Sequence, residues 1–361
     1  GKGAAMHIGI LTGGGDCPGL NAVIRAVTLA LLREGGARVT GIERGFHGLL
    51  ARRSRPLAAD DVSGLLAVGG TILGTHNLCH PFRDTEAGGA DRSAEAMAYA
   101  RELGLDALVA IGGDGTMEIA YRFHQLGLPV VGVPKTIDND LPGTDRTFGF
   151  DSAVTVVAEA LDRLSTTARS HNRVMIAETM GRYAGWIALE GGMAGGADAI
   201  LIPEQPFDIE RVAALCRERE ARGGVGGCTL ICIAEGAHAV GEGLTLRATL
   251  PGSPDPLRLG GVGHALQQQL QPLVKSEVRT TLLGHTQRGG SPTAYDRVLA
   301  TRFGFEAAQL VRAGQFGRMV ALQGENVTSV ALADIAGRSR PVPPDHELLR
   351  AAQGIGVSLG G

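Results

Sequence analysis

Short apolar runs rich in β-branched residues alternate with amphipathic stretches along most of the chain. The first apolar run is His7–Leu11, and a stretch with helical spacing follows from about Leu20 to Glu34. The same unit recurs with apolar runs at Ala107–Ile111 and Val130–Val133, again separated by an amphipathic stretch. Buried apolar strands joined by crossover helices are typical of parallel sheets covered on both faces. The pattern therefore predicts an α/β fold.

The second half of the chain continues this alternation. We predict a helix from about Thr293 to Ala313, and strands at Val174–Ala177, Ala199–Ile202, Thr229–Ala234, Val278–Leu283 and Met319–Leu322. The stretch Ser152–Ser170 contains no Gly or Pro and could bridge two domains, so the first domain boundary is placed near residue 150. Ala37–Ala59 and Gly236–Gly261 are interpreted as connecting or insertion regions.

Charge and hydropathy exclude several classes of partner. The 34 basic and 37 acidic side chains give a formal net charge of −3. This balance argues against nucleic acid or an anionic membrane as the main partner, because both require a basic surface. No apolar run reaches the ~18 residues of a transmembrane helix, and the first five residues lack the apolar core of a signal peptide.

The five cysteines do not form a recognisable site. Cys228 and Cys232 share an apolar segment, but three residues separate them. That spacing suits neither a zinc site nor a redox pair. We expect buried thiols in a reducing cytoplasm, and hence a cytoplasmic protein.

Glycine makes up about 15% of the chain against a usual share of roughly 7%, and part of the excess lies in loops at strand ends. The first such loop, 11–21, contains three consecutive glycines and opens a helix. Consecutive glycines let backbone N–H groups approach a phosphate, and the helix N-terminus adds a favourable dipole. The loop matches neither a Walker A motif nor a dinucleotide fingerprint. A tight strand–helix turn is the alternative interpretation.

Two further loops add carboxylates to this picture. Gly112–Thr116 follows the second predicted strand, and Asp114 there supplies a hard oxygen suited to Mg²⁺, or alternatively a helix N-cap. The loop 134–140 holds two carboxylates, one of which could accept a proton from a substrate hydroxyl. Lys135 beside them could neutralise a transferring phosphoryl group; an Asp/Asn-rich turn is the alternative. Together the three loops indicate phosphoryl transfer.

A phosphorylated acceptor needs cationic side chains to hold it. A lone arginine is usually a solvated surface residue, so the candidates gain weight only as a set. They are Arg173, Arg182, Arg279, His285 and Arg288. Glu235 follows a predicted strand, where it could accept hydrogen bonds from sugar hydroxyls or simply be an exposed acid.

The order of these motifs carries a family resemblance. The segments GGGDCPGLN, GGDGT, PKTIDND, SHNRV, MGRYAGW and LGHTQRGGSPTAYDR occur in this order between about residues 6 and 330. The chain thereby resembles 6-phosphofructokinases of the bacterial type. It is most similar to the actinobacterial branch, which mixes ATP and pyrophosphate users.

The resemblance implies two Rossmann-like parallel-sheet domains with the active site in the cleft between them. Residues 1–149 with about 287–335 would bind the phosphoryl donor and Mg²⁺, and residues 150–286 would bind the sugar phosphate. Residues 336–361 would form a C-terminal extension. The implied reaction is phosphorylation of fructose 6-phosphate at O1, a step of glycolysis.

The resemblance also assigns roles to residues. Asp138 matches the general base, with Thr136 and Lys135 beside it, and Asp114 matches the Mg²⁺-linked carboxylate. The donor site would comprise Gly14, Asn77, Gly113, Asp114, Gly115 and Thr116. The sugar-phosphate site would comprise Thr136, Asp138, Arg173, Met180, Gly181, Arg182, Glu235, Arg279, His285 and Arg288. In the family, the matches of Arg173 and Arg279 reach into a neighbouring subunit, so a homotetramer, or at least a homodimer, is expected.

Two positions bear on the choice of donor. Pyrophosphate-dependent relatives carry Asp at the position of Gly115, where its carboxylate takes the place of the ATP α-phosphate, and Lys at the position of Lys135. This chain is mixed, with Gly115 and Lys135. An obstructing side chain excludes a ligand whereas a nearby cation does not, so we predict ATP as the donor. Pyrophosphate is the alternative.

One position departs from the family. After Gly69–Gly74 the family carries an Arg that bridges donor and substrate, and this chain has Asn77 in a loop that is one residue longer. Losing a guanidinium aimed at transferring charge lowers the rate strongly. His76, His80 or Arg83 could replace it, the acceptor could be another phosphorylated sugar, or the chain could be a weakly active ligand-binding homologue.

Overall fold

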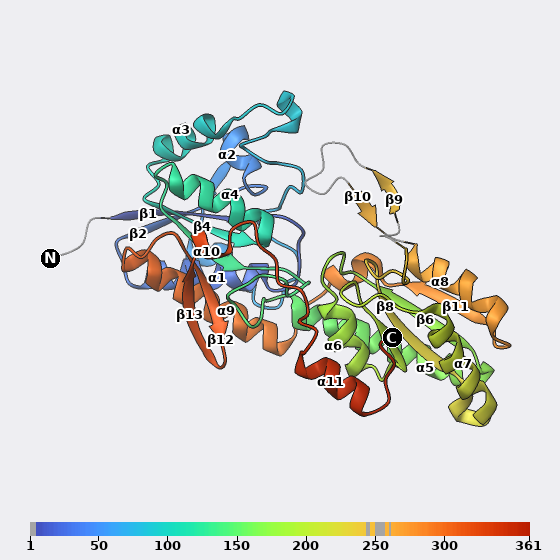
Figure 1. Ribbon diagram of the computed structural model, residues 1–361. Coiled ribbons are helices and arrows are strands. Elements are labelled where there is room, and N and C mark those ends of the chain that lie inside the picture. The colour runs from blue at the N-terminus through green and yellow to red at the C-terminus, as the bar shows by residue number, and fades with distance from the viewer. Residues whose placement is uncertain (1–4, 243–245, 250–256, 260) are drawn as a thin grey trace. The chain divides into compact units, whose positions relative to one another are not determined.

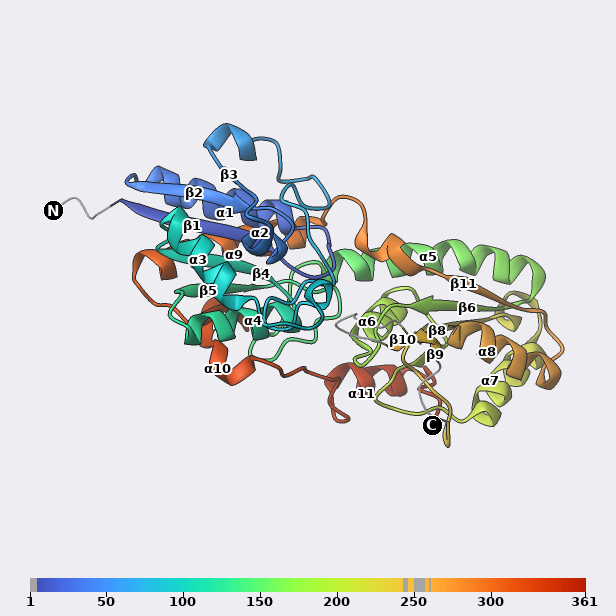
Figure 2. The same ribbon diagram turned by 90° about the horizontal axis from the view of Figure 1, so that it is seen from above.

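The computed structural model describes residues 5–242, 246–249, 257–259 and 261–361. The chain divides into two compact units, drawn in Figures 1 and 2. The first contains the described residues up to Asp151 together with Arg288–Ser339. The second contains the described residues of 152–287 together with Arg340–Gly361.

The first unit is built on a seven-stranded sheet in the order β13-β12-β5-β4-β1-β2-β3. Its strands are β1 (Met6–Thr12), β2 (Ala37–Ile42), β3 (Ser54–Pro56), β4 (Ala107–Gly112), β5 (Val130–Pro134), β12 (Arg318–Gln323) and β13 (Asn326–Ala331). β1, β2, β4, β5 and β12 run parallel, while β3 and β13 pair antiparallel at the two edges. The parallel α/β prediction is therefore confirmed, and the two antiparallel edge strands are additions to it.

Helices cover both faces of this sheet (Figures 1 and 2), with α1 and α9 on one face and α3 and α4 on the other. The helices of the unit are α1 (Leu20–Arg33), α2 (His47–Ala51), α3 (Ser93–Leu103), α4 (Asp114–Gln125), α9 (Ala294–Arg312) and α10 (Leu332–Ile335). α1 and α9 pack closely because Gly304 has no side chain: a Cβ there would lie 2.7 Å from that of Ala26.

The prediction that Ala37–Ala59 is a connecting region is wrong. Its first part forms β2, which pairs in parallel with β1 from Met6↔Ala37 to Ile10↔Gly41. Val39, Thr40 and Ile42 are buried in β2. Sheet pairing over a separation of about thirty residues stabilises this short run, which is too brief to stand out by periodicity alone.

The second unit contains a four-stranded parallel sheet in the order β11-β6-β8-β7. Its strands are β6 (Val174–Thr179), β7 (Ala199–Leu201), β8 (Thr229–Ala234) and β11 (Val278–Leu282). Its helices are α5 (Phe150–His171), which begins in the first unit, α6 (Trp186–Ala194), α7 (Ile209–Arg222), α8 (Val262–Leu270) and α11 (Glu347–Gly354). Short 3₁₀ turns in the chain are Ala59–Val62, Thr85–Ala87, Gly224–Gly227, Gln271–Leu273 and Gly284–Arg288.

Two predictions fall partly outside the described residues. Of the predicted insertion Gly236–Gly261, the structure describes β9 (Leu246–Thr249) and β10 (Leu257–Leu259), which pair antiparallel as a separate two-stranded sheet. Of the first five residues, for which no signal peptide is expected, only Ala5 is described. None of the helices within the described ranges is long and apolar enough to cross a membrane.

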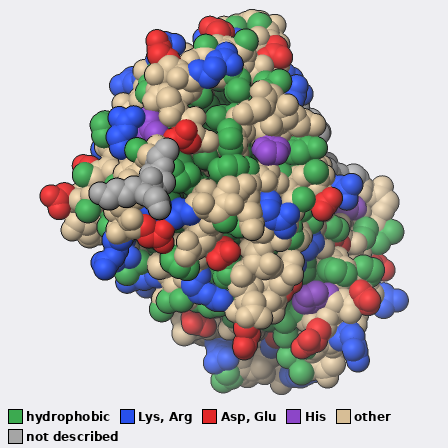
Figure 3. Space-filling model, turned by 90° about the vertical axis from the view of Figure 1, so that its left-hand side faces the viewer, with side chains coloured by type: hydrophobic (Ala, Val, Ile, Leu, Met, Phe, Trp, Pro, Cys, Tyr) green, Lys and Arg blue, Asp and Glu red, His purple; other side chains and the backbone are tan. Residues whose placement is uncertain are grey.

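The cysteines are unbridged and mostly buried, as expected from the sequence. All five cysteines are unbridged, and four of them are buried while Cys79 is half-buried. Burial raises the pKa of Cys17 and of Cys232 to about 12, so both thiols are unreactive at neutral pH. On the face of the molecule drawn in Figure 3, acidic and basic side chains are interspersed.

Candidate functional site

The three predicted phosphate-type loops follow adjacent strands of the first sheet. β5, β4 and β1 are parallel neighbours in that order, so their carboxyl ends lie along one edge. Ligands bind at this edge in open α/β sheets. The strand order thus brings together loops that are separated by up to about 120 residues in the sequence.

The first and second loops pack directly against each other. The N–H of Gly13 donates to the Ile111 carbonyl at 2.9 Å, and Gly14 has a φ of +73°. Thr116 is buried beneath both loops. A Cβ on Gly13 would lie 2.5 Å from the Thr116 hydroxyl oxygen, and one on Gly112 would lie 2.3 Å from it. These two glycines are therefore required for packing against Thr116.

Lys135 lies in the wall behind the first loop. The side chain is buried, and its ammonium donates to the Gly15 carbonyl. Burial lowers the pKa of Lys135. A Cβ on Gly14 would lie 3.3 Å from the same Nζ. Lys135 therefore joins the third loop to the first, a structural task that the sequence analysis did not anticipate for it.

Three carboxylates gather at the third loop. Burial raises the pKa of Asp140 well above its usual range, and the negative charges of Asp138 and Asp114 raise it further. The Asp138 N–H donates to the Thr136 hydroxyl oxygen at 3.0 Å. Asp140 is a site residue that was not singled out from the sequence, although its spacing from Asp138 was the available signal. Environments that push the pKa values of neighbouring carboxyls apart suit proton transfer.

The turn that carries Asp138 is held by its neighbours. Asn139 adopts a left-handed conformation, with a φ of +52°. Its side-chain oxygen accepts a hydrogen bond from the Thr147 N–H at 2.9 Å, and the Thr147 hydroxyl donates to the Thr136 carbonyl at 2.7 Å. These bonds fix the direction of the loop and so preorganise Asp138.

Asp114 and Gly115 lie exposed in the first turn of α4. The Gly115 N–H donates to the Asp114 carboxylate at 2.8 Å. Apart from its two chain neighbours and the backbone of its own helix, no atom of the described residues lies within 4 Å of a Cβ built on Gly115. The position beside the helix N-terminus is therefore open, and a helix N-terminus attracts anions.

The carboxylates fit a magnesium ion. Over the described part of the chain, no three His, Cys, Asp or Glu side chains are grouped to hold a metal by themselves. Magnesium is usually held by one or two carboxylates together with substrate phosphates. Asp114 is exposed, and the charges of Asp114 and Asp138 both act on Asp140. These oxygen donors match the preference of Mg²⁺.

The loop with the departing residue lies against the first loop. The Thr75 hydroxyl donates to the Gly14 carbonyl at 2.6 Å. The His76 ring stacks on His47 with centroids 4.9 Å apart, and its Nε2 lies 3.9 Å from the Glu86 carboxylate. Asn77 is exposed. The stacking on His47 holds the His76 ring in place beside Thr75.

This histidine makes stability depend on pH. Burial lowers the pKa of His76, and the neighbouring His47 and Arg44 lower it further, while Glu86 and Asp84 raise it. The folded state therefore resists a proton that the unfolded state accepts below pH ~6.5. We expect the free energy of unfolding to fall, relative to that of His76→Gln, as pH decreases from ~6.5. Urea unfolding at several pH values measures this difference; a pH-independent difference would contradict the prediction.

The predicted sugar-phosphate residues of the second unit divide between two edges of its sheet. Met180, Gly181 and Arg182 follow β6, Glu235 follows β8, and His285 lies beyond β11. These strands are parallel neighbours, so the residues lie at one edge. Arg173 precedes β6 and Arg279 lies near the start of β11, at the opposite edge. There Arg279 forms an ion pair with Glu277, whose other oxygen lies 3.8 Å from the Arg173 Nε.

At the first of these edges, the backbone brings Arg182 and Glu235 together. Gly181 has a φ of +121°, and its carbonyl accepts the Gly236 N–H at 3.1 Å. A Cβ on Gly236 would lie only 1.8 Å from the Arg182 carbonyl oxygen. The Arg182 Nε lies 3.7 Å from a Glu235 carboxylate oxygen. The pair presents one cation and one anion, as recognition of a phosphate and of sugar hydroxyls requires.

Gln287 and Arg288 follow the same strand, β11, but make contacts that were not predicted from the sequence. Gln287 is fully buried and its side-chain oxygen accepts the Met180 N–H at 3.2 Å, a positioning role that the sequence analysis missed. Arg288 belongs to the first unit. Its guanidinium donates to the Asp16 carbonyl at 3.1 Å and lies against Gly15, so it contacts the donor-type loop.

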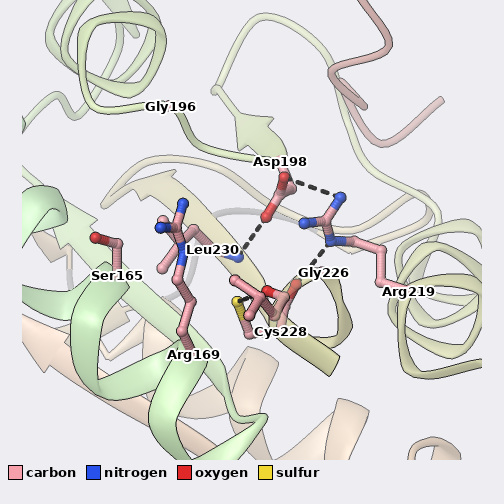
Figure 4. Close-up of a pocket in the computed structure, with 9 residues that line it drawn as sticks. Ser165, Arg169, Gly196, Asp198, Arg219, Gly226, Cys228 and Leu230 are labelled. Carbon is pink, nitrogen blue, oxygen red and sulfur yellow. Dashed lines mark hydrogen bonds and ion pairs between the residues drawn. The ribbon is translucent and has the colours of Figure 1, made fainter. Parts of the chain in front are cut away.

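The second unit also contains a cavity of about 240 Å³, shown in Figure 4. Arg169 of α5 and Arg219 of α7 line it, and Arg219 lies 3.2 Å from Asp198. None of the site residues predicted from the sequence lines this cavity. It is therefore separate from the loops described above.

Comparison with known proteins agrees with this geometry. The phosphofructokinase family model matches residues 7–311. An ATP-dependent 6-phosphofructokinase of Chloroflexus aurantiacus is 51% identical over 358 residues, covering 98% of each chain. A pyrophosphate–fructose 6-phosphate 1-phosphotransferase of Amycolatopsis methanolica is 48% identical over 341 residues, covering 94% of this chain and 97% of its own.

A solved structure shares the fold. The pyrophosphate-dependent phosphofructokinase of Nitrosospira multiformis superposes with a TM-score of 0.80 at 19% identity, covering 99% of this chain and 93% of its own. At that identity the likeness speaks for the fold alone. The family match and the two sequence relatives decide the family: this chain belongs to the phosphofructokinase family.

Proposed function

We propose that the protein is an ATP-dependent phosphotransferase that phosphorylates fructose 6-phosphate at O1 to form fructose 1,6-bisphosphate. The observation that carries this proposal is the junction of three loops at one sheet edge, where Asp138 and Asp114 lie beside an open helix N-terminus. The first unit would bind the donor and the second the sugar phosphate. The name of the Chloroflexus relative supports the same reaction.

Asp138 is the proposed general base. Its carboxylate accepts the proton of the sugar 1-hydroxyl while that oxygen attacks the γ-phosphorus of ATP, and ADP leaves with the electrons of the broken P–O bond. Asp114 would hold Mg²⁺, with Asp138 and Asp140 nearby. The ion, when bound, neutralises charge on the phosphates. The Thr136 hydroxyl oxygen accepts a hydrogen bond from the Asp138 N–H and so helps to fix the position of Asp138. Lys135 binds the Gly15 carbonyl and holds the glycine loop of the proposed donor site.

ATP is preferred to pyrophosphate on the openness of Gly115. A Cβ built on this residue meets no neighbouring side chain, which supports an open space for a nucleotide phosphate there. The pyrophosphate-type Lys135 is buried in the loop wall, so it does not close the nucleotide site. Gly14, Gly113 and Thr116 complete the proposed donor site. Pyrophosphate use is the alternative, in line with the name of the Amycolatopsis relative.

The sugar phosphate is proposed to bind at the edge formed by Met180, Gly181, Arg182, Glu235 and His285, with Arg288 beside the donor loop. Arg173 and Arg279 lie at the opposite edge of the same sheet. Because one bound substrate cannot span both edges of a sheet, these two arginines are proposed to serve the site of a neighbouring subunit. This division supports a homotetramer, or at least a homodimer, and sedimentation analysis measures it. The five unbridged thiols support a cytoplasmic location.

A coupled assay with ATP and with pyrophosphate, across several ketose phosphates, tests the proposal. We expect turnover with ATP and fructose 6-phosphate. Faster turnover with another phosphorylated sugar would identify a different acceptor, an alternative that the exposed Asn77 favours. Binding of sugar phosphate without turnover with either donor would leave only a ligand-binding homologue.

Restoring an arginine at position 77 tests the departure from the family. We expect Asn77→Arg to raise kcat with fructose 6-phosphate by about tenfold or more, because a guanidinium aimed at transferring phosphoryl charge stabilises the transition state. Steady-state kinetics measure the change, with Asn77→Lys as a control that adds charge without a planar fork. An unchanged kcat would mean that another cation already performs this role.

A further inference from the structure

The C-terminal segment, residues 340–361, is built into the second unit. Ser358 pairs in parallel with Ala199 of β7, and the Ile200 N–H donates to its carbonyl at 2.9 Å. The Asp208 N–H donates to the Gly360 carbonyl at 2.7 Å. In Figures 1 and 2, α11 of this segment lies beside α6. The segment therefore covers the edge of the sheet instead of extending freely.

The start of the segment encloses the single tryptophan of the chain. The Trp186 Nε1 donates to the Arg340 carbonyl at 3.0 Å, and the Arg340 guanidinium lies 4.7 Å from the centre of the indole ring. His346 packs edge-on against the same ring, with centroids 5.0 Å apart. Trp186 is the first residue of α6, directly after the loop Met180–Gly185. The segment thus contacts the residue that directly follows that loop.

The half-buried carboxylate of Glu204 makes the second link. The Glu204 oxygens accept the Gly185 N–H at 3.0 and 3.1 Å, and one of them also accepts the Val342 N–H at 2.7 Å. Burial raises the pKa of Glu204, and these two N–H donors oppose the rise. A Cβ on Gly185 would lie 2.4 Å from that of Ile202. Gly185, the last residue of the loop, is therefore held by Ile202 and Glu204, which follow β7, and Glu204 in turn binds the C-terminal segment.

We propose that the C-terminal segment positions the loop Met180–Gly185 for sugar-phosphate binding, acting through Glu204 and Trp186. The inference rests on the proposed function, which places Arg182 of this loop at the sugar phosphate. A small displacement of a group that holds the substrate weakens binding or slows transfer, because both need a defined geometry. Glu204 and Val342 touch no reacting atom in this scheme, so they are positioning residues.

The test compares two substitutions at one position. Val342 is buried, and in the sequence it stands between Pro341 and Pro343. A residue before proline is restricted to extended conformations, which a proline can share. Val342→Pro removes the N–H that reaches Glu204, whereas Val342→Ala keeps it and also loses buried side-chain atoms. Comparing the two variants therefore distinguishes the effect of losing the hydrogen bond to Glu204 from the effect of losing side-chain packing.

We expect Val342→Pro to raise KM for fructose 6-phosphate by about tenfold relative to Val342→Ala, with kcat and KM for ATP unchanged. Hydrogen–deuterium exchange of peptides covering 180–186 should be faster in Val342→Pro than in Val342→Ala. Equal exchange, or an equal KM for the sugar phosphate in the two variants, would overturn the inference. Absence of turnover in the wild-type chain would instead overturn the proposed function, and the exchange comparison would still decide whether the segment holds the loop.

Discussion

Replacing Asp138 by Asn is expected to lower kcat with ATP and fructose 6-phosphate by about 10²–10⁴-fold, the usual contribution of a positioned general base. An amide cannot take the proton of the sugar hydroxyl at neutral pH, although it retains the shape of the carboxylate. The Asp138 N–H to Thr136 bond is a backbone contact and survives the substitution. The turn held by Asn139 and Thr147 should therefore keep its conformation.

Steady-state kinetics and isothermal titration with fructose 6-phosphate measure the two halves of this prediction. Binding of the sugar phosphate should remain, and the thermal midpoint should not fall. Asp140→Asn is the informative comparison, because the burial that raises the pKa of Asp140 already favours its protonated form. A kcat for Asp138→Asn near that of the wild type would remove Asp138 from the mechanism.

Introducing a carboxylate at Gly115 is expected to lower kcat/KM for ATP by about 10²-fold or more, since placing like charges together costs several kcal/mol. The new side chain has room, because a Cβ at this position meets nothing within 4 Å beyond its chain neighbours and the backbone of its own helix. It would extend beside the N-terminus of α4, where an acidic residue is favourable for the helix. The loss should therefore arise from repulsion of the nucleotide phosphates and not from misfolding.

Gly115→Ala is the matched control for Gly115→Asp. It adds a Cβ in the same open space without charge, so its kcat/KM for ATP should stay near the wild-type value. The two variants are compared by ATP titration at saturating fructose 6-phosphate, and pyrophosphate is tested in parallel. If Asp and Ala affect ATP use equally, the openness of Gly115 does not select the donor.

The alternation of strands and helices could be predicted from the sequence because its signal is local. Thr229–Ala234 was predicted with the bounds that β8 has. The predicted range of α1 differs by one residue at its C-terminal end, and that of α9 by one residue at each end. Apolar periodicity and strand-end glycines are properties of neighbouring residues, so they do not depend on the tertiary context. The region Ala37–Ala59 shows the limit, since β2 is recognisable only through its pairing with β1.

The candidate site shows the same division between local and long-range information. The sequence identified the glycine loops, but not that Thr116 fills the space where Gly13 and Gly112 would carry side chains. It presented Lys135 as a cation for a phosphoryl group, whereas the fold buries that ammonium against the Gly15 carbonyl. Side-chain environment depends on contacts over more than 100 residues of separation, which no local pattern contains.

Residue types, their order and their spacing were sufficient to determine the family and the kinds of chemistry available. Only the tertiary structure decided which strand ends are neighbours, and therefore that Asp114, Asp138 and Asp140 share one field while Arg173 and Arg279 lie at the edge opposite Arg182. Strand order is set by hydrogen bonds and packing between distant segments. A sequence pattern reports what each segment prefers, but it does not report which segments meet.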